Sequence, residues 1–249
     1  MSFLTINFGH FSAGKLEDLL RLSGFPEPYY SASEVEARRW SLEYRQRLIQ
    51  EDLAALEDVK DYGKLELLMQ RLPDLVGSPL SIHGLCEDLQ ASHKAVTRWV
   101  DIFARLYALF KIPPFGAPML RAVKKEQKHY HYDWSLVKDS GARFENMVAM
   151  HLLKWIQFEW DSKARELELR YFRDIDGREV DFIVLENAKP IMAIECKWSD
   201  HDISSSLNYF KQRFPAVDAY QISMQGQKEY ISKTKIHVCN SLKFLRNLI

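Results

Sequence analysis

The chain has 249 residues, of which 47% are hydrophobic and 27% are charged, and its 34 basic and 34 acidic residues cancel to a net charge of zero. This composition, with only three widely spaced cysteines, is typical of a globular, cytoplasmic protein of one large or two small domains whose thiols stay reduced. No apolar run approaches the roughly 18 residues of a membrane span, and the N-terminus lacks the regions of a secretory signal, so no membrane role is expected.

The basic residues are unevenly distributed along the chain. Residues 1–76 contain 9 basic and 13 acidic residues, a net charge of −4, whereas residues 90–132 contain 8 basic and 2 acidic residues, a net charge of +6. A basic block inside a neutral protein is typical of a phosphate-binding face, and a solvated surface is the alternative.

Residues 1–76 are predicted to form a helical N-terminal segment. The turn-rich stretch SGFPEPYY is followed by Ser33 and Glu36, which have the spacing of a capping box at a helix start. Aromatic and aliphatic residues then recur at helical spacing, which predicts an amphipathic helix over 34–58. A second helical stretch, KLELLMQRL, follows.

Residues 77–137 are predicted to form a winged helix-turn-helix domain. Ser81 and Ser92 are placed to cap two consecutive helices, and the hydrophobic spacing extends the second helix over 93–110. The stretch LRAVKKEQKHYHYDW indicates a basic β-ribbon, so we expect the second helix to enter a DNA major groove with the ribbon beside it. A small helical subdomain that packs against a neighbour is the alternative. The residues expected to contact nucleic acid are Lys94, Thr97, Arg98, Lys124, Lys125 and Lys128.

Residues 138–249 are predicted to form an α/β domain. A long helix over 141–160 precedes two strands that a turn at Asp176 and Gly177 joins. The strand PIMAIECKW, the helix ISSSLNYFKQRF and the strand DAYQISM follow. This order favours an α/β sandwich with a mixed sheet.

Charged residues inside these strands predict a functional site, because burying an unpaired charge is very costly. Glu195 and Lys197 share a strand face, and a turn at 186–189 would bring Asp181 of the preceding strand alongside them. Glu145 falls on the otherwise apolar stripe of the long helix, so it is expected to face inward. Oxygen ligands at one sheet edge suit Mg²⁺ or Mn²⁺, and Lys197 would orient a water or neutralise developing charge. A simple ion pair between Lys197 and a carboxylate is the alternative.

The pattern E…D-x13-E-x-K resembles the PD-(D/E)xK nuclease superfamily over residues 140–225. The resemblance implies a restriction-endonuclease-like α/β domain whose catalytic residues would be Glu145, Asp181, Glu195 and Lys197. Its metal ligands would be Asp181, Glu195, Glu145 and the main-chain carbonyl of Cys196. The chain departs from the superfamily pattern in that only Tyr209 and Gln212 on the following helix are available to support the site.

From Leu19 onward, the chain also resembles the C-terminal portion of a prokaryotic family of AAA-type ATPases. The matching segments are SGFPEPYY, RRWSLEYRQRLIQEDL, the helix-turn-helix segment, and YFRDIDGREVDFIV followed by IECKW, in that order. The nucleotide-binding core of the family is missing. Gly9 to Leu16 comes within one residue of GxxxxGK[ST], but Leu16 lacks the hydroxyl that binds Mg²⁺, so no ATPase activity is expected from this chain alone.

These observations predict a DNA-binding protein with a metal-dependent nuclease-like domain. The alternative is a catalytically inactive DNA-binding or assembly module that partners an AAA-type ATPase or another copy of itself. A regulatory fragment of an ATPase without a nucleic-acid role is a third interpretation.

Overall fold

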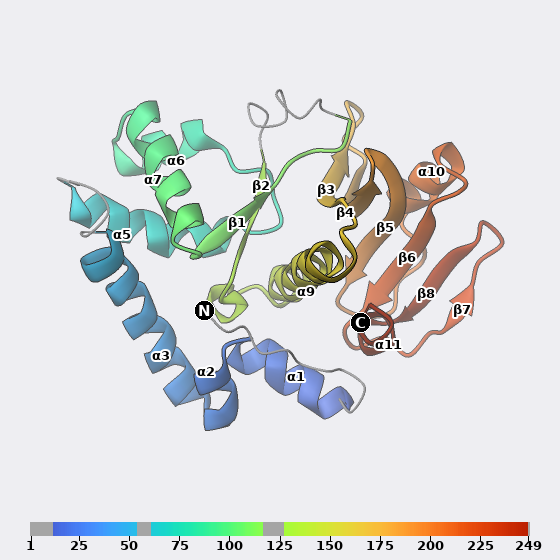
Figure 1. Cartoon of the computed structure of the whole chain (residues 1–249), viewed down its shortest axis with the longest axis horizontal. Helices are drawn as coiled ribbons and strands as arrows, with labels where there is room; N and C mark the ends of the chain where they lie inside the picture. The colour runs from blue at the N-terminus through green and yellow to red at the C-terminus, as the bar shows by residue number, and fades with distance from the viewer. Residues whose placement is uncertain (1–11, 54–60, 117–126, 249) are drawn as a thin grey trace. The chain divides into compact units, whose positions relative to one another are not determined.

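The computed structural model describes residues 12–53, 61–116 and 127–248 (Figure 1). Within these residues the protein is mixed α/β, with nine α-helices, a six-stranded mixed sheet and a two-stranded sheet. None of the helices in these ranges is long and apolar enough to cross a bilayer. The described residues divide into two compact units, one of 17–111 and 128–143 and the other of 12–16, 112–116, 127 and 144–248.

The first unit is mainly helical, as expected for the N-terminal part of the chain. Its helices are α1 (Ala13–Leu22), α2 (Pro26–Ser31), α3 (Glu34–Arg47), the π-helical η2 (Leu48–Leu53), α5 (Tyr62–Arg71), the 3-10 turn η3 (Leu72–Leu75), α6 (Ile82–Leu89) and α7 (His93–Arg105). The two-stranded sheet of β1 (Leu109–Ile112) and β2 (Lys128–His131) follows, and then the 3-10 turn η4 (Trp134–Leu136). The last part of the helix predicted over 34–58, residues 54–58, lies outside the described residues.

Serine caps set the start of three helices in this unit, as the sequence predicts. The hydroxyl oxygens of Ser33, Ser81 and Ser92 accept hydrogen bonds from the backbone N–H three residues later, over 3.4, 3.2 and 3.2 Å. Each bond satisfies one of the backbone donors that a helix start leaves without an intrahelical partner. Helices α3, α6 and α7 therefore begin where local sequence alone places them.

The helix predicted over 93–110 is shorter than expected, because α7 ends at Arg105. Tyr107 has a φ of 58°, a left-handed conformation that an α-helix cannot continue through. The chain then extends, and Leu109 and Phe110 are buried as part of β1. A short apolar run such as LYALF has no period that separates helix from strand, so only its tertiary partners decide its conformation.

The second unit holds the six-stranded sheet. Its elements are the main part of α9 (Ser140–Lys163), β3 (Leu167–Arg173), β4 (Glu179–Glu186), β5 (Lys189–Lys197), α10 (Ser205–Arg213), β6 (Asp218–Ser223), β7 (Tyr230–Ile231), β8 (Ile236–Asn240) and α11 (Ser241–Arg246). The strand order is β3-β4-β5-β6-β8-β7, in which β5, β6 and β8 run parallel and the other pairs are antiparallel. The mixed sheet expected from the sequence is confirmed.

Two tight turns fix the register of the three consecutive strands. Gly177, between β3 and β4, has a φ of 77°, and Asn187 and Ala188, between β4 and β5, have φ values of 50° and 62°. Two successive residues with positive φ are what a two-residue type I′ hairpin requires. The turns predicted at 176–177 and 186–189 are therefore both present.

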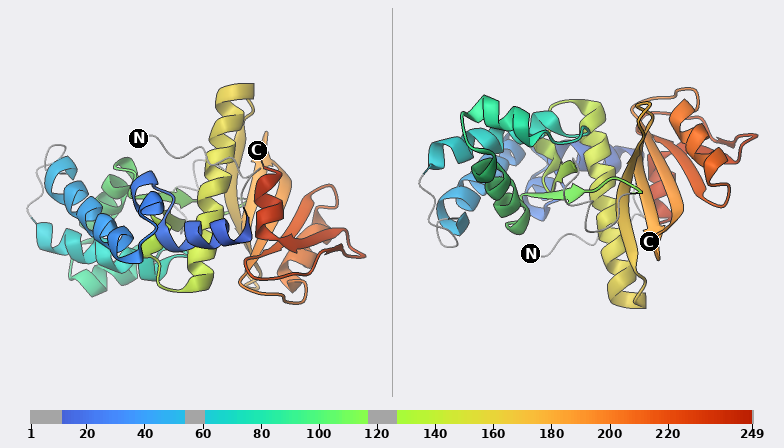
Figure 2. Two further views of the ribbon diagram at one scale, coloured as in Figure 1. Left: turned by 90° about the horizontal axis from the view of Figure 1, so that it is seen from below. Right: turned by 90° about the horizontal axis from the view of Figure 1, so that it is seen from above.

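Helices cover both faces of the sheet (Figures 1 and 2), with α9 along one face and α10 on the other. The face under α10 carries a continuous apolar core, in which Ile183 of β4 and Ala193 of β5 pack with Leu207 and Phe210 of α10. This core fixes which strand residues point toward α10, and therefore where the charged residues of β4 and β5 lie.

Candidate functional site

Asp181, Glu195 and Lys197 lie on the sheet face that α10 covers. Ile183 pairs with Ala193 across β4 and β5, and both belong to the core beneath α10. Side chains two residues apart share a strand face, so Asp181 before Ile183 and Glu195 and Lys197 after Ala193 extend the same face beyond the core. The structure thus gathers three of the four residues that the sequence assigns to catalysis.

One hydrogen bond joins Lys197 to Glu195, and another joins Asp181 to the backbone of β5. The Lys197 ammonium donates to Glu195 Oε1 over 2.8 Å. Asp181 Oδ2 accepts a hydrogen bond from the backbone N–H of Cys196 over 2.8 Å. The Asp181 carboxylate therefore accepts the hydrogen bond that a backbone carbonyl of β4 would otherwise accept from β5. This bond holds Asp181 next to Cys196, directly before Lys197.

Glu195 is the buried member of the group, with 6% of its surface exposed. Its second carboxylate oxygen, Oε2, is buried and has no hydrogen-bond partner in the described protein. Burial and the charge of Asp181 raise the pKa of Glu195 to about 7, although Lys197 and the Ser204 hydroxyl act in the opposite direction. Burial lowers the pKa of the Lys197 ammonium, but the attraction of the Glu195 and Asp181 carboxylates is larger, so the pKa is raised overall.

Gln221 supports the site, a role that the sequence analysis did not assign to it. Gln221 is buried and pairs with Glu195 across the parallel strands β5 and β6. Its Oε1 accepts from the N–H of Ser204 over 2.8 Å, and its Nε2 donates to the carbonyls of Asp202 and His201 over 3.1 and 3.3 Å. The amide therefore holds the loop after β5 against Glu195. A glutamine inside the apolar strand DAYQISM was the available signal.

The two residues of α10 that were available to support the site, Tyr209 and Gln212, have other surroundings. The ring of Tyr209 stacks under the guanidinium of Arg178, with 4.3 Å from the guanidinium carbon to the ring centroid. Gln212 is exposed to solvent. The supporting amide therefore comes from Gln221 on the adjacent strand β6 and not from α10.

Glu145 is not part of a metal-holding group with Asp181 and Glu195. No cluster of three or more His, Cys, Asp or Glu side chains among the described residues is arranged to hold a metal ion. Glu145 belongs to α9, which covers the sheet face opposite α10 (Figure 2). The apolar stripe of α9 is buried, as predicted, but no metal-holding cluster joins Glu145 to the two strand carboxylates among the described residues.

Asp181 and Glu195 provide carboxylate oxygens, which are donors of the type that Mg²⁺ takes. Mg²⁺ keeps several waters and takes one or two protein carboxylates together with phosphate oxygens of a substrate. Glu195 offers a buried oxygen without a partner, and the repulsion between Glu195 and Asp181 is one that a cation would relieve. The predicted contribution of the Cys196 carbonyl stays a prediction.

In the first unit, α7 presents the basic face expected of a recognition helix. Lys94 and Arg98 are exposed and Thr97 is partly exposed, and they line an open hollow on the surface of α7. The acidic residue on this face, Asp101, forms an ion pair with Lys111 over 2.6 Å, so its negative charge is offset.

The structure does not place the other three predicted DNA contacts on an exposed face. These are Lys124, Lys125 and Lys128. Lys124 and Lys125 lie outside the described residues. Lys128 is fully buried in β2, and its backbone bridges to Pro79, so it is not the exposed phosphate contact that the sequence predicts. Neighbouring His129 is also buried, and its ring nitrogen contacts the carbonyl of Leu72 over 2.9 Å. The β-ribbon packs inward here because its inner residues complete the core of this unit.

Two protein families match the chain. The family described as domain of unknown function DUF8612 matches residues 13–141, which is 129 of the 249 residues. The family described as domain of unknown function DUF4143 matches residues 140–244, and domains of this second kind are often found with AAA ATPases. No curated protein and no solved structure matches the chain.

Proposed function

We propose that this chain, which belongs to the family described as domain of unknown function DUF8612, is a DNA-binding protein whose second unit cleaves phosphodiesters with a divalent cation. The observation that carries the proposal is the buried carboxylate of Glu195, which has one oxygen without a partner and lies beside Asp181 and Lys197. Such an arrangement is costly for folding alone, and strongly perturbed carboxylates of this kind concentrate at functional sites.

Asp181 and Glu195 would hold the cation, which supplies polarisation of the phosphodiester and ionisation of a bound water. Glu195 must be ionised to take this part, and because its pKa is about 7, a proton competes with the cation below that pH. Lys197 keeps its charge at neutral pH, since its pKa is raised. Its side chain is partly exposed at the C-terminal end of β5, where the ammonium can orient a phosphate oxygen against the two carboxylates.

We expect cleavage to depend on added divalent cation. Purified protein incubated at pH 8 with supercoiled plasmid, branched duplexes or single strands should cut at least one of these substrates with Mg²⁺ or Mn²⁺ present. The same reactions with EDTA should show no product, because the two carboxylates alone cannot polarise the phosphodiester. Cleavage that continues at the same rate in EDTA would contradict the proposal.

DNA binding is proposed for the first unit, where α6, a short turn, α7 and the β1–β2 ribbon follow in the order of a winged helix-turn-helix. The exposed lysine and arginine of α7 supply the positive charge that a phosphate backbone requires. The burial of Lys128 removes this residue from the proposed contact surface, and the contacts that stay proposed are those on α7 together with Lys124 and Lys125, which lie outside the described residues.

Neutralising this face should weaken DNA binding and reduce its salt dependence. In the double variant Lys94→Gln and Arg98→Gln, loss of two phosphate contacts should lower the slope of log K against log [salt] by about 2, since each contact contributes about 0.9. Fluorescence anisotropy with a labelled duplex from 50 to 250 mM salt measures this slope. The matched control is Arg38→Gln with Arg39→Gln on α3, which removes two exposed charges from another helix. Equal slopes in the two double variants would remove α7 from the interface.

A second function, an inactive assembly module, is favoured by one observation. The Lys197–Glu195 ion pair and the Asp181–Cys196 hydrogen bond already engage most polar atoms of the site, as a purely structural group would. In that case the second unit would recruit an AAA-type ATPase, with which domains like it are often found. DNA binding without any cation-dependent cleavage is the result that selects this function.

A further inference from the structure

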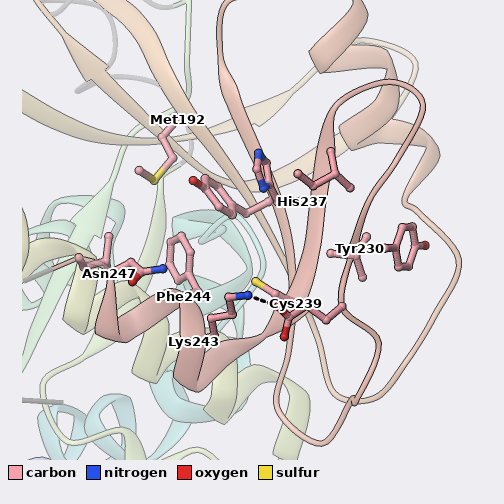
Figure 3. Close-up of a pocket in the computed structure, with 12 residues that line it drawn as sticks. Met192, Tyr230, His237, Cys239, Lys243, Phe244 and Asn247 are labelled. Carbon is pink, nitrogen blue, oxygen red and sulfur yellow. Dashed lines mark hydrogen bonds and ion pairs between the residues drawn. The ribbon is translucent and has the colours of Figure 1, made fainter. Parts of the chain in front are cut away.

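A cavity in the second unit lies away from the proposed cleavage site. It has a volume of about 400 Å³ and lies between β6, β8, the β7 hairpin and α11 (Figure 3). Tyr220 of β6 lines it, and because Tyr220 immediately precedes Gln221 in the strand, it points to the face opposite Glu195. The volume falls within the range of small-molecule sites in proteins.

Aromatic and apolar side chains form the walls of this cavity. The rings of Tyr220 and His237 stack with their centroids 5.0 Å apart, and the ring of Phe244 lies 5.1 Å from Tyr220. Met192 of β5 and Leu248 after α11 line the same cavity. Flat rings on several sides favour a flat, apolar ligand, because aromatic surfaces gain from offset stacking and edge contacts beyond their buried area.

One ion pair borders the cavity. The ammonium of Lys243 on α11 donates to the carboxylate of Glu229, and Figure 3 shows Lys243 near Cys239. Both side chains are more than half exposed, at 52% and 60%. An exposed pair of this kind contributes little to stability. An anionic group on a ligand in the cavity can therefore replace Glu229 as the partner of Lys243 at small cost.

We propose that this cavity binds a flat aromatic monoanion, with the ring against the wall that Tyr220, His237 and Phe244 form and the carboxylate on Lys243. The site does not depend on the proposed cleavage chemistry, because it uses the other face of the sheet. Cys239 also lines the proposed ligand site.

The experiment uses the full chain and two matched probes, 2-naphthoate and the neutral 2-naphthylmethanol, followed by ligand fluorescence. Saturable binding with a preference of at least about tenfold for the carboxylate is expected. Lys243→Gln should abolish this preference, and Glu229→Gln should tighten naphthoate binding several-fold because Lys243 loses its competing partner. Lys233→Gln, which removes another exposed lysine from the β7–β8 hairpin, is the control and should change nothing.

A second readout reports the position of the ligand. Burial raises the pKa of the Cys239 thiol to about 11, so iodoacetamide modifies it slowly. Naphthoate in the cavity should slow this modification further, as measured by peptide mass mapping, whereas Cys86 of the first unit serves as the internal reference. No saturable binding of naphthoate, or equal affinity in Lys243→Gln and the parent protein, would overturn the proposal.

Discussion

Asp181→Asn and Lys197→Met are each expected to reduce cation-dependent DNA cleavage by at least about 100-fold, the size of loss that follows removal of one group that stabilises transition-state charge. Asn keeps an acceptor for the Cys196 N–H but removes the negative charge that a cation needs. Met keeps the apolar stem of Lys197 but removes the ammonium beside Glu195. Initial rates on the substrate that the parent protein cuts provide the measurement.

Two control variants separate this effect from a general disturbance of the sheet. Asp218→Asn removes an exposed carboxylate at the start of β6, and Lys189→Met removes an exposed lysine at the other end of β5. Both should cleave at the parental rate. Full activity in Asp181→Asn or Lys197→Met would show that any cleavage arises from another site or from a contaminant.

Glu195→Gln should remove cleavage and, at pH 8 without divalent cation, make the protein more stable. The pKa of Glu195 rises from an ordinary 4.5 to about 7 through burial and the charge of Asp181, so the folded protein favours the neutral carboxyl. The stabilisation from this neutral form is complete below pH 4.5 and is lost as the pH rises through 7. At pH 8 the parent protein holds a disfavoured buried charge that Gln lacks, a difference of up to about 3 kcal/mol.

Urea unfolding from pH 5 to pH 8 measures this difference. The gap in free energy of unfolding between Glu195→Gln and the parent protein should widen as the pH rises, and the slope of unfolding on urea should stay the same. Adding Mn²⁺ should stabilise the parent protein and leave Glu195→Gln nearly unchanged, which narrows the gap. A gap that does not vary with pH, or a less stable Glu195→Gln at pH 8, would contradict a strained carboxylate at this position.

Together the variants at Asp181, Lys197 and Glu195 separate the proposed enzyme from a structural ion pair. A structural pair loses stability when either partner is neutralised, because the other charge is left buried and uncompensated. At a cation site, neutralising Glu195 has the opposite effect and stabilises the fold. The negative charge of Glu195 serves cation binding, and without a cation it lowers the free energy of unfolding. The pH dependence of the free energy of unfolding therefore tests the site without any DNA substrate, and it does so even if no cleaved substrate is found.

The sequence by itself determined the features that depend on neighbouring residues. Ser33, Ser81 and Ser92 placed three helix starts because a cap needs only a hydroxyl near the next few N–H groups. Turn residues and the alternation of side chains along a strand placed Asp181, Glu195 and Lys197 on one face, because the two hairpins leave few other registers.

Only the tertiary structure decided which elements meet. Periodicity placed Glu145 on the buried stripe of its helix, but the packing of α9 decides which side chains its residues meet, and no cluster of three metal-holding side chains forms among the described residues. The sequence predicts that Lys128 is a basic surface residue, but Lys128 is buried because its strand, β2, completes the core of the first unit. Gln221 comes beside Glu195 through the parallel pairing of β5 and β6, a contact between residues far apart in sequence that no local pattern encodes.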